Sequence, residues 1–265
     1  MAIQIETVPS VDFQMRFFRF GKKDAPPLVL LPGLSVKPVA DSADAVAAAY
    51  GDIAADYEVF VFERRDDLPT EYTVDEMARD TAAAMDALGI CSAVVMGVSQ
   101  GGMIAQCLAL QRPELVGTLV LCSTAASVKG GGEQVLQHWI DLARAGDATA
   151  LMRSFAETIY TDAFYARYKT AFDRLAKTVT PQELDRFVRL AQAAPGFDVT
   201  ERLAAVRCPA LVLGAKGDRV FGAKPSEELA KALGAQLYIY EDYGHAVYDE
   251  APDLRARVLA FLHKV

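Results

Sequence analysis

Short, uninterrupted apolar runs recur along this chain, and segments with helical spacing separate most of them. A strand that is buried on both faces shows such a run, because neither face alternates with solvent. One intervening segment, residues 74–89, repeats apolar side chains at helical spacing and ends at Gly89, as a helix C-terminus does. The alternation predicts an α/β fold with a mostly parallel sheet covered by helices on both faces. Residues 13–20 instead alternate apolar and polar side chains, which predicts a strand in a hairpin with residues 3–7. The apolar runs lie at residues 27–33, 57–62, 92–97, 117–123, 209–214 and 235–240.

One long region lacks the alternation. Residues 129–200 contain several amphipathic helical stretches and no convincing strand, and they are rich in large side chains. The region opens with KGGG (129–132) and contains APG (194–196), and both are typical of boundaries or hinges. We therefore predict a helical insertion at residues 129–200, seated on a core that residues 1–128 and 201–265 form.

The segment VVMGVSQGGMIAQ, residues 94–106, joins an apolar run to a helical segment through a serine between glycines. A tight turn alone would explain the glycines, because a Cβ beside so sharp a turn would clash with the neighbouring strand and helix. However, residues 97–101 match G-x-S-x-G in the strand–turn–helix context that a nucleophile elbow requires. The match predicts that the turn presents Ser99 as a nucleophile, at a helix N-terminus that favours developing negative charge.

A serine hydroxyl is a weak nucleophile that needs a base within hydrogen-bonding reach, and the chain has only three histidines. His245 follows the last apolar run, so its loop emerges at the carboxyl edge of the predicted sheet, the same edge as Ser99. His138 lies in the insertion and His263 lies two residues from the end of the sequence, and we expect both to be structural or solvated. His245 is therefore the predicted base.

The base needs a carboxylate to orient it. Asp218 lies in the loop after the penultimate apolar run, again at the carboxyl edge. Asp242 is a rival, but it lies only three residues before His245, which makes it harder for its carboxylate to face the imidazole ring. Asp218 is therefore preferred as the acid.

The order Ser99, Asp218, His245 is that of the α/β-hydrolase fold, and the chain resembles cap-bearing members of that superfamily. The resemblance extends from about residue 25 to residue 263. It rests on LVLLPGLS for the oxyanion-loop strand, MGVSQGG for the elbow, CPALVLGAKGDRV for the acid strand and loop, and YGHAVYDEAPDLRARVLAFL for the histidine loop and final helix.

The resemblance implies a three-layer fold with an eight-stranded, mostly parallel sheet, and it makes the insertion a helical cap. It also implies an oxyanion hole formed by the backbone N–H groups of Leu34 and Gln100. The chain departs from the family at Pro32-Gly33, where many members have His-Gly, so the support of the hole differs. It departs again at ERRDDLPTEYT (63–73), where many members have Asp-x-Arg-Gly-x-Gly-x-Ser.

Substrate contacts are less constrained by the sequence. Arg64 and Arg65 lie in a loop that is usually near the pocket in this family, and they could attract a substrate carboxylate, although most such pairs form surface or loop ion pairs. Most aromatic and Met side chains of the insertion are expected to form its own core, while a few face the pocket, and Trp139 and Tyr160 are our candidates. This composition favours an apolar or aromatic acyl substrate.

Together these residues predict a serine hydrolase that cleaves a carboxylic ester, lactone or thioester through an acyl-enzyme. The same triad also supports C–C bond hydrolysis and cofactor-free perhydrolysis, and the sequence does not separate these reactions. A serine at position 99 argues against the haloalkane dehalogenases and epoxide hydrolases, since those relatives need a carboxylate nucleophile. A ligand-binding or receptor protein with little turnover is an alternative of another class. No metal or organic cofactor is implied.

Charge and cysteine usage exclude some partners and indicate a compartment. With 27 basic and 35 acidic residues the net charge is −8, which argues against nucleic acid or an anionic membrane as the main partner. The sequence shows neither a secretory signal nor an apolar run long enough to span a bilayer, so we expect a cytoplasmic protein. Its four scattered cysteines form no CxxC pair, and we expect them to be buried thiols rather than disulfides or zinc ligands. The oligomeric state is left open.

Overall fold

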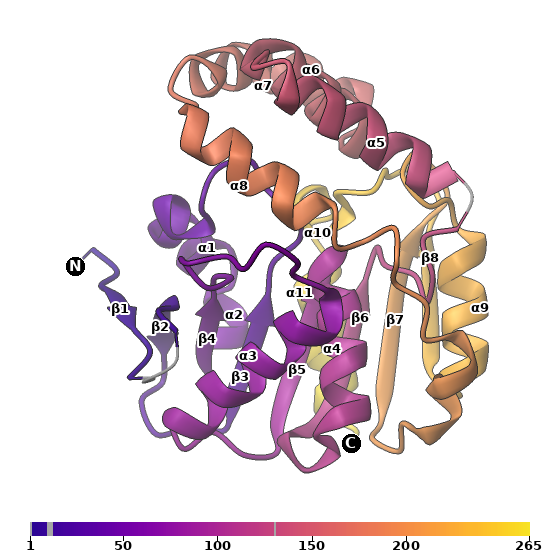
Figure 1. Cartoon of the computed structure of the whole chain (residues 1–265). Coiled ribbons are helices and arrows are strands. Elements are labelled where there is room, and N and C mark those ends of the chain that lie inside the picture. Colours follow the sequence, from indigo (N-terminus) through magenta and orange to yellow (C-terminus); the bar gives the residue numbers. More distant parts are fainter. Residues whose placement is uncertain (1, 10–12, 130) are drawn as a thin grey trace.

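A mixed β-sheet runs through the middle of the molecule, with helices on both of its faces (Figure 1). The computed structural model describes residues 2–9, 13–129 and 131–265. The strands in this part of the chain are β1 (Ile5–Thr7), β2 (Arg16–Gly21), β3 (Pro27–Leu31), β4 (Glu58–Phe62), β5 (Ala93–Val98), β6 (Val116–Cys122), β7 (Ala210–Ala215) and β8 (Gln236–Tyr240). They form one eight-stranded sheet in the order β1-β2-β4-β3-β5-β6-β7-β8. The pairs β1–β2 and β2–β4 are antiparallel and the other neighbouring pairs are parallel, which confirms the predicted mostly parallel sheet.

The central strands are buried on both faces, which explains their uninterrupted apolar sequences. In β3, Val29 and Leu31 pack into a core on one face of the sheet, whereas Leu28 and Leu30 pack into a second core on the other face. The first core includes residues of α3 (Val74–Ala87), α4 (Gln100–Gln111) and α9 (Lys224–Leu233). The second includes residues of α1 (Ala43–Ala49), α2 (Gly51–Ala54) and α11 (Leu254–Leu262).

The predicted N-terminal hairpin is present, but its second strand is displaced. β1 pairs with β2 in a register that places Ile5 opposite Phe18. β2 begins at Arg16 rather than at residue 13, because pairing with β1 starts where Thr7 faces Arg16. Residues 10–12, which connect to this strand, lie outside the described part of the chain.

Helix α3 shows how local sequence sets its bounds. Thr73 and Glu76 form a reciprocal capping box at its start, which satisfies two backbone donors of the first turn. At its end Gly89 has a φ of 69°, a left-handed conformation that costs glycine little. The N–H of Ile90 then donates to the carbonyl of Met85, which closes the helix in a Schellman motif. Leu88 is the C-cap residue and Gly89 follows it directly, so the helix ends next to the predicted Gly89.

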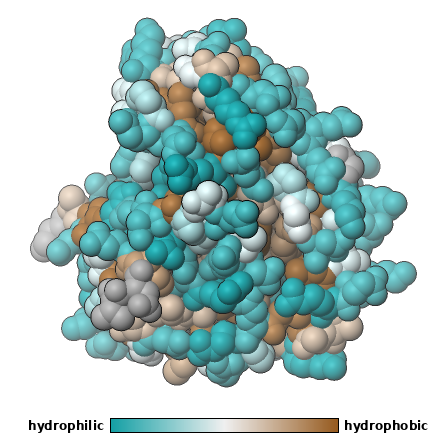
Figure 2. Space-filling model, viewed as in Figure 1, coloured by the Kyte–Doolittle hydropathy of each residue, from teal (hydrophilic) through white to brown (hydrophobic). Residues whose placement is uncertain are grey.

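Four helices form a layer over one edge of the sheet, at the top of Figure 1. They are α5 (Gly131–Arg144), α6 (Ala148–Ile159), α7 (Asp162–Ala176) and α8 (Pro181–Ala191). A single β-bridge between Ser127 and Asp198 brings the two ends of this segment together. Figure 2 shows a mostly hydrophilic face, on which hydrophobic side chains gather in the upper part, where these helices lie. The predicted boundary at 129–132 includes Gly130, which lies outside the described residues.

The prediction of four buried cysteines is wrong in part. Cys107 and Cys122 are buried, but Cys208 is half-buried and Cys91 is exposed. Cys91 lies in the short connection between α3 and β5, where only one face of the chain contacts the core. None of the helices in the described residues is both long enough and apolar enough to cross a bilayer.

Candidate active site

Ser99 lies in a strained turn between β5 and α4. Its φ and ψ are 50° and −118°, which is a rare conformation for a residue with a side chain. Neighbouring elements hold the turn in place. The N–H of Ser99 donates to the carbonyl of Cys122 at 2.9 Å, and the Thr124 hydroxyl donates to the carbonyl of Ser99 at 2.8 Å. The strain is therefore maintained by β6 and the residues that follow it.

The glycines around Ser99 are needed because other atoms lie close to each of them, backbone at Gly97 and Gly101 and a side chain at Gly102. A Cβ on Gly97 would lie 2.5 Å from the carbonyl oxygen of Gly101, at the start of α4. A Cβ on Gly101 would lie 2.0 Å from the carbonyl oxygen of Leu31, at the end of β3. A Cβ on Gly102 would lie 2.6 Å from the side chain of Thr124. The turn is thus packed on three sides, by its own helix, by β3 and by the segment after β6.

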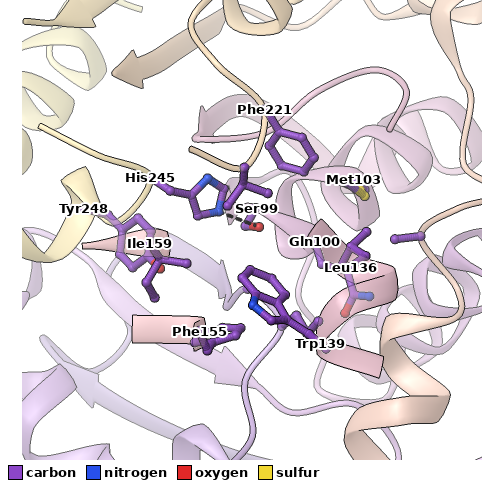
Figure 3. A pocket seen from close by; sticks show the side chains of 14 residues that line it. Ser99, Gln100, Met103, Leu136, Trp139, Phe155, Ile159, Phe221, His245 and Tyr248 are labelled. Atoms are coloured by element: carbon purple, nitrogen blue, oxygen red, sulfur yellow. Dashed lines mark hydrogen bonds between the residues drawn. The ribbon is translucent and has the colours of Figure 1, made fainter. Parts of the chain in front are cut away.

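Ser99, His245 and Asp218 form a hydrogen-bonded chain. Ser99 Oγ lies 2.9 Å from His245 Nε2, and Figure 3 shows the two side chains pointing toward each other. His245 Nδ1 lies 2.8 Å from Asp218 Oδ2. His245 and Asp218 are only 3% and 8% exposed, so little water competes for these bonds. Three loops that are far apart in the sequence, after β5, β7 and β8, bring these groups together.

Asp218 is held as a carboxylate by its surroundings. Burial alone would raise its pKa, but the charge and the hydrogen bond of His245 and the backbone amides of Phe221 and Val220 outweigh burial and lower the pKa. The two amides donate to Asp218 Oδ1 at 3.0 and 2.7 Å. Asp242, the rival from the sequence, is exposed. The geometry therefore favours Asp218 over Asp242 as the partner of His245.

Two residues with unpaired backbone donors among the described residues line the same small cavity as Ser99. Leu34 and Gln100 line this cavity together with Ser99, and an added Cβ on Gly33 would lie only 3.2 Å from the Ser99 Cβ. Within the described residues, the backbone N–H groups of Leu34 and Gln100 donate no hydrogen bond to the protein. Gln100 is also the first residue of α4, where helix N–H groups lack intrahelical partners.

Buried side chains support the loop that carries Leu34. Arg64 donates from Nη2 to the carbonyl of Pro32 at 2.7 Å and to Gln100 Oε1 at 3.5 Å. Gln100 Nε2 in turn donates to the carbonyl of Leu190, near the end of α8, at 2.7 Å. One network thus links the Pro32 loop, the start of α4 and the helical layer.

Arg64 and Arg65 do not line the cavity beside Ser99. Arg64 is 6% exposed and does not line the cavity beside Ser99, because its guanidinium is used by the Pro32 loop. Burial lowers the pKa of Arg64 to about 10, which still leaves it charged near neutral pH. Arg65 forms ion pairs with Asp67 at 3.0 Å and Asp80 at 3.7 Å. In this structure both arginines contact other parts of the protein, and their contact with a substrate carboxylate stays a prediction.

The helical layer closes the cavity over Ser99 (Figure 3). Trp139 of α5 lines this small cavity, and its indole Nε1 is buried without a hydrogen-bond partner among the described residues. A second cavity, of about 410 Å³, is lined by Tyr160, at the end of α6. The two cavities share five lining residues, which are Gly33, Leu34, Phe155, Ile159 and Tyr248.

Sequence reasoning missed Asp249, the carboxylate of the larger cavity. It lies on α10 (Val247–Glu250), four residues after His245, and accepts a hydrogen bond from the Tyr160 hydroxyl at 2.9 Å. Its position four residues after the predicted catalytic histidine could have identified Asp249 from the sequence as a residue near the site. Phe155 and Ile159 were missed because an amphipathic helix does not reveal which of its apolar residues face a ligand. Within the described residues, no group of three or more His, Cys, Asp or Glu side chains is arranged to hold a metal ion.

A family model described as "alpha/beta hydrolase fold" matches residues 43–252. The chain belongs to the α/β-hydrolase family. Solved structures agree with this assignment. An α/β hydrolase from a Medee basin deep-sea metagenome superposes with a TM-score of 0.88 over 98% of both chains, at 21% identity. The enol-lactonase from Burkholderia xenovorans gives 0.86 over 97% of this hydrolase and 100% of that chain, at 20% identity, and both likenesses concern the fold.

Relatives in sequence are hydrolases of different names. The protein named "Putative carbamate hydrolase RutD" from Pseudomonas savastanoi pv. phaseolicola is 29% identical over 91% of this hydrolase and 95% of its own length. The protein named 3-oxoadipate enol-lactonase 2 from Acinetobacter baylyi is 24% identical over 81% and 80%. The resemblance that the four motifs carried is therefore confirmed at the level of the family and the fold.

Proposed function

We propose that this α/β hydrolase is a serine hydrolase that cleaves an ester-type bond of a small, largely apolar substrate through an acyl-enzyme. The observation that supports this proposal is the hydrogen-bonded chain from Ser99 through His245 to Asp218, which opens into a cavity. In this proposal Ser99 is the nucleophile, His245 the general base and Asp218 the group that orients it.

The acylation step follows from the order of these contacts, with His245 as the tautomer that carries its proton on Nδ1. Neutral His245 donates its Nδ1–H to Asp218 and accepts the hydroxyl proton of Ser99 at Nε2, as Ser99 Oγ attacks the substrate carbonyl carbon. Asp218, whose pKa is lowered, stays ionised and stabilises the imidazolium that forms. The imidazolium then donates its proton to the leaving group, and the carbonyl carbon remains bonded to Ser99. Water, deprotonated by His245, then attacks the acyl carbon. The bond to Ser99 Oγ breaks, His245 returns the proton to Oγ, and the acid is released.

The negative charge of each tetrahedral intermediate needs donors that are already in place. We assign this role to the backbone N–H groups of Leu34 and Gln100, since both line the cavity of Ser99 and have no protein acceptor among the described residues. One such donor contributes about 3 kcal/mol to the transition state in comparable sites. The N-terminal end of α4 adds a favourable dipole at the same place.

We further propose that residues 129–200 act as a cap that selects the substrate. Its side chains Trp139 and Phe155 close the cavity beside Ser99, and Phe155 also lines the larger cavity. The names of the relatives are compatible with this chemistry. A carbamate and an enol-lactone both present a carbonyl carbon that is bonded to a heteroatom leaving group, as the proposed reaction requires.

Active-site labelling tests the proposal directly. We expect a fluorophosphonate probe to label the wild-type enzyme once and the Ser99→Ala variant not at all. The turnover of p-nitrophenyl acetate should be lost in the same variant. His245→Ala should abolish turnover, whereas His263→Ala should not, because the His263 side chain is exposed and forms an ion pair with Asp56 at 3.4 Å, away from the cavity. Equal turnover by Ser99→Ala and wild type would overturn the assignment.

A further inference from the structure

The larger cavity contains one carboxylate among mostly apolar and aromatic walls. Asp249 lines it on α10, together with residues of the helical layer such as Met152, Phe172 and Leu175. Tyr248, the residue before Asp249, lines both this cavity and the one beside Ser99. A ligand that reaches Ser99 can therefore extend past Tyr248 toward Asp249.

The charge of Asp249 lacks a cationic partner in the protein. Its Oδ2 accepts a hydrogen bond from the Tyr160 hydroxyl, but within the described residues it forms no salt bridge. The charge of Arg255 lowers the pKa of Asp249, but the Arg255 guanidinium donates its hydrogen bond to the carbonyl of Tyr248 at 2.9 Å. The aspartate therefore has a hydrogen-bond donor but no counter-ion.

Lys37 also lines the cavity, and its positive charge is paired with carboxylates of the protein. Lys37 Nζ lies 2.7 Å from Glu183 and 3.9 Å from Asp41, and it also donates to the carbonyl of Thr178. The positive charge of Lys37 is therefore balanced within the protein, and the negative charge of Asp249 is available to a ligand.

The Asp249 carboxylate is accessible along the cavity. The surrounding protein and the neighbouring Glu250 nevertheless raise the pKa of this carboxyl above its ordinary value. The hydrogen bond from Tyr160 and the charge of Arg255 oppose the rise without cancelling it. A positively charged ligand in the cavity would stabilise the ionised carboxylate of Asp249.

Aromatic rings supply the second half of a cation site. Tyr50, Tyr160, Phe172 and Tyr248 all line the cavity that holds Asp249. The faces of aromatic rings attract organic cations, and the attraction is stronger where water is excluded. A carboxylate among such rings discriminates an ammonium group from a neutral group of the same shape by charge alone.

We infer that the larger cavity is a subsite for an organic ammonium group, held by Asp249 and the surrounding aromatic rings, so that the enzyme prefers substrates with a cationic nitrogen remote from the scissile bond. The preference for cationic substrates rests on the proposed function, because it requires that a substrate occupies the cavity. Binding of the ammonium group itself does not require hydrolysis.

The test compares cations with neutral molecules of similar shape. Hexylammonium is paired with 1-hexanol, and choline with 3,3-dimethylbutan-1-ol, and their dissociation constants are measured by calorimetry on the full-length Ser99→Ala variant at pH 8. We expect at least one cation to bind about tenfold more tightly than its neutral partner. In Ser99→Ala/Asp249→Asn this preference should disappear, because the amide keeps the acceptor for Tyr160 but carries no charge.

Two further variants separate charge from structure. Asp242→Asn removes an exposed carboxylate from the same segment and should leave the preference unchanged. Tyr160→Phe removes the hydrogen bond but keeps the carboxylate, so the preference should persist. The inference is overturned if neither cation binds more tightly than its neutral partner, or if the preference survives in Asp249→Asn. Absence of Ser99-dependent hydrolysis with the binding preference intact would instead refute the proposed function alone.

Discussion

Replacement of Gly101 by alanine tests how the site is assembled. The new Cβ would lie 2.0 Å from the carbonyl oxygen of Leu31, 2.6 Å from the carbonyl carbon of Leu31 and 2.6 Å from the carbonyl oxygen of Pro32. All three atoms are backbone, so no side chain can rotate away. An ordinary contact is at least 3.4 Å, which means that the end of β3 and the start of α4 must separate by roughly 1.4 Å.

This separation should reduce activity more than stability. Overpacking of this kind costs about 1–3 kcal/mol, and each kcal/mol lowers the Tm of a domain of this size by roughly 2–4 °C. The same shift moves the loop that carries Leu34 away from Gln100, so the two proposed oxyanion donors no longer converge. A displacement of about 1 Å in such a site costs about 100-fold in rate. We therefore expect kcat for p-nitrophenyl acetate to fall about 100-fold or more in Gly101→Ala.

Gly51→Ala is the matched control. Gly51 lies in α2, and a Cβ added there meets nothing within 4 Å. Alanine is the better helix former, so stability should rise slightly and kcat should not change. Initial rates with p-nitrophenyl acetate and thermal melts of both variants provide the comparison. If Gly101→Ala retained wild-type kcat and Tm, the contact between β3 and α4 would not be the constraint that the geometry indicates.

Three further predictions follow from single side chains. Asp218→Asn should lower kcat by about 10³–10⁴-fold while Asp242→Asn leaves it unchanged, as measured by p-nitrophenyl acetate turnover, and equal losses in the two variants would refute the choice of acid. Because the pKa of Asp218 is lowered in the folded protein, its contribution to stability is present above its unfolded pKa and is lost as the pH falls through the folded value. The pKa of Asp249 is raised, so its ionisation disfavours folding as the pH rises above the unfolded value. Asp249→Asn should therefore raise the Tm at pH 8, and the gain should shrink toward pH 4, whereas a gain independent of pH would contradict a desolvated charge. Arg64→Met should lower kcat about tenfold or more with little change in KM, because the Pro32 carbonyl loses its buried donor. A rise in KM confined to esters that carry a carboxylate would restore Arg64 to substrate binding.

Much of the fold could be predicted because its signals are local. The six apolar runs became strands β3 to β8. In the central strands, burial on both faces dictates the composition independently of the strand's partners, whereas β8 lies at the edge of the sheet and is partly exposed. Ser99, Asp218 and His245 could be singled out in the same way. Each follows a predicted strand, and the carboxyl ends of parallel strands meet at one edge of a sheet. This argument requires only that each residue follows a parallel strand, and it needs neither the order of the strands nor any distance between them.

Tertiary structure decided what the remaining polar residues contact. Arg64 looked like a ligand for a substrate carboxylate, yet it binds the carbonyl of Pro32, and nothing in either segment indicates that pairing. In the sequence Asp249 is one more acidic residue on a short helix, but in the folded chain it lines a cavity with residues of the helical layer and accepts a hydrogen bond from Tyr160. A side chain's environment depends on segments distant in sequence, whereas strand and helix patterns depend on neighbours. For this reason the sequence alone determined the sheet, the turn at Ser99 and the candidate triad, and only the folded chain decided the supports of the oxyanion loop and the charge of the cavity.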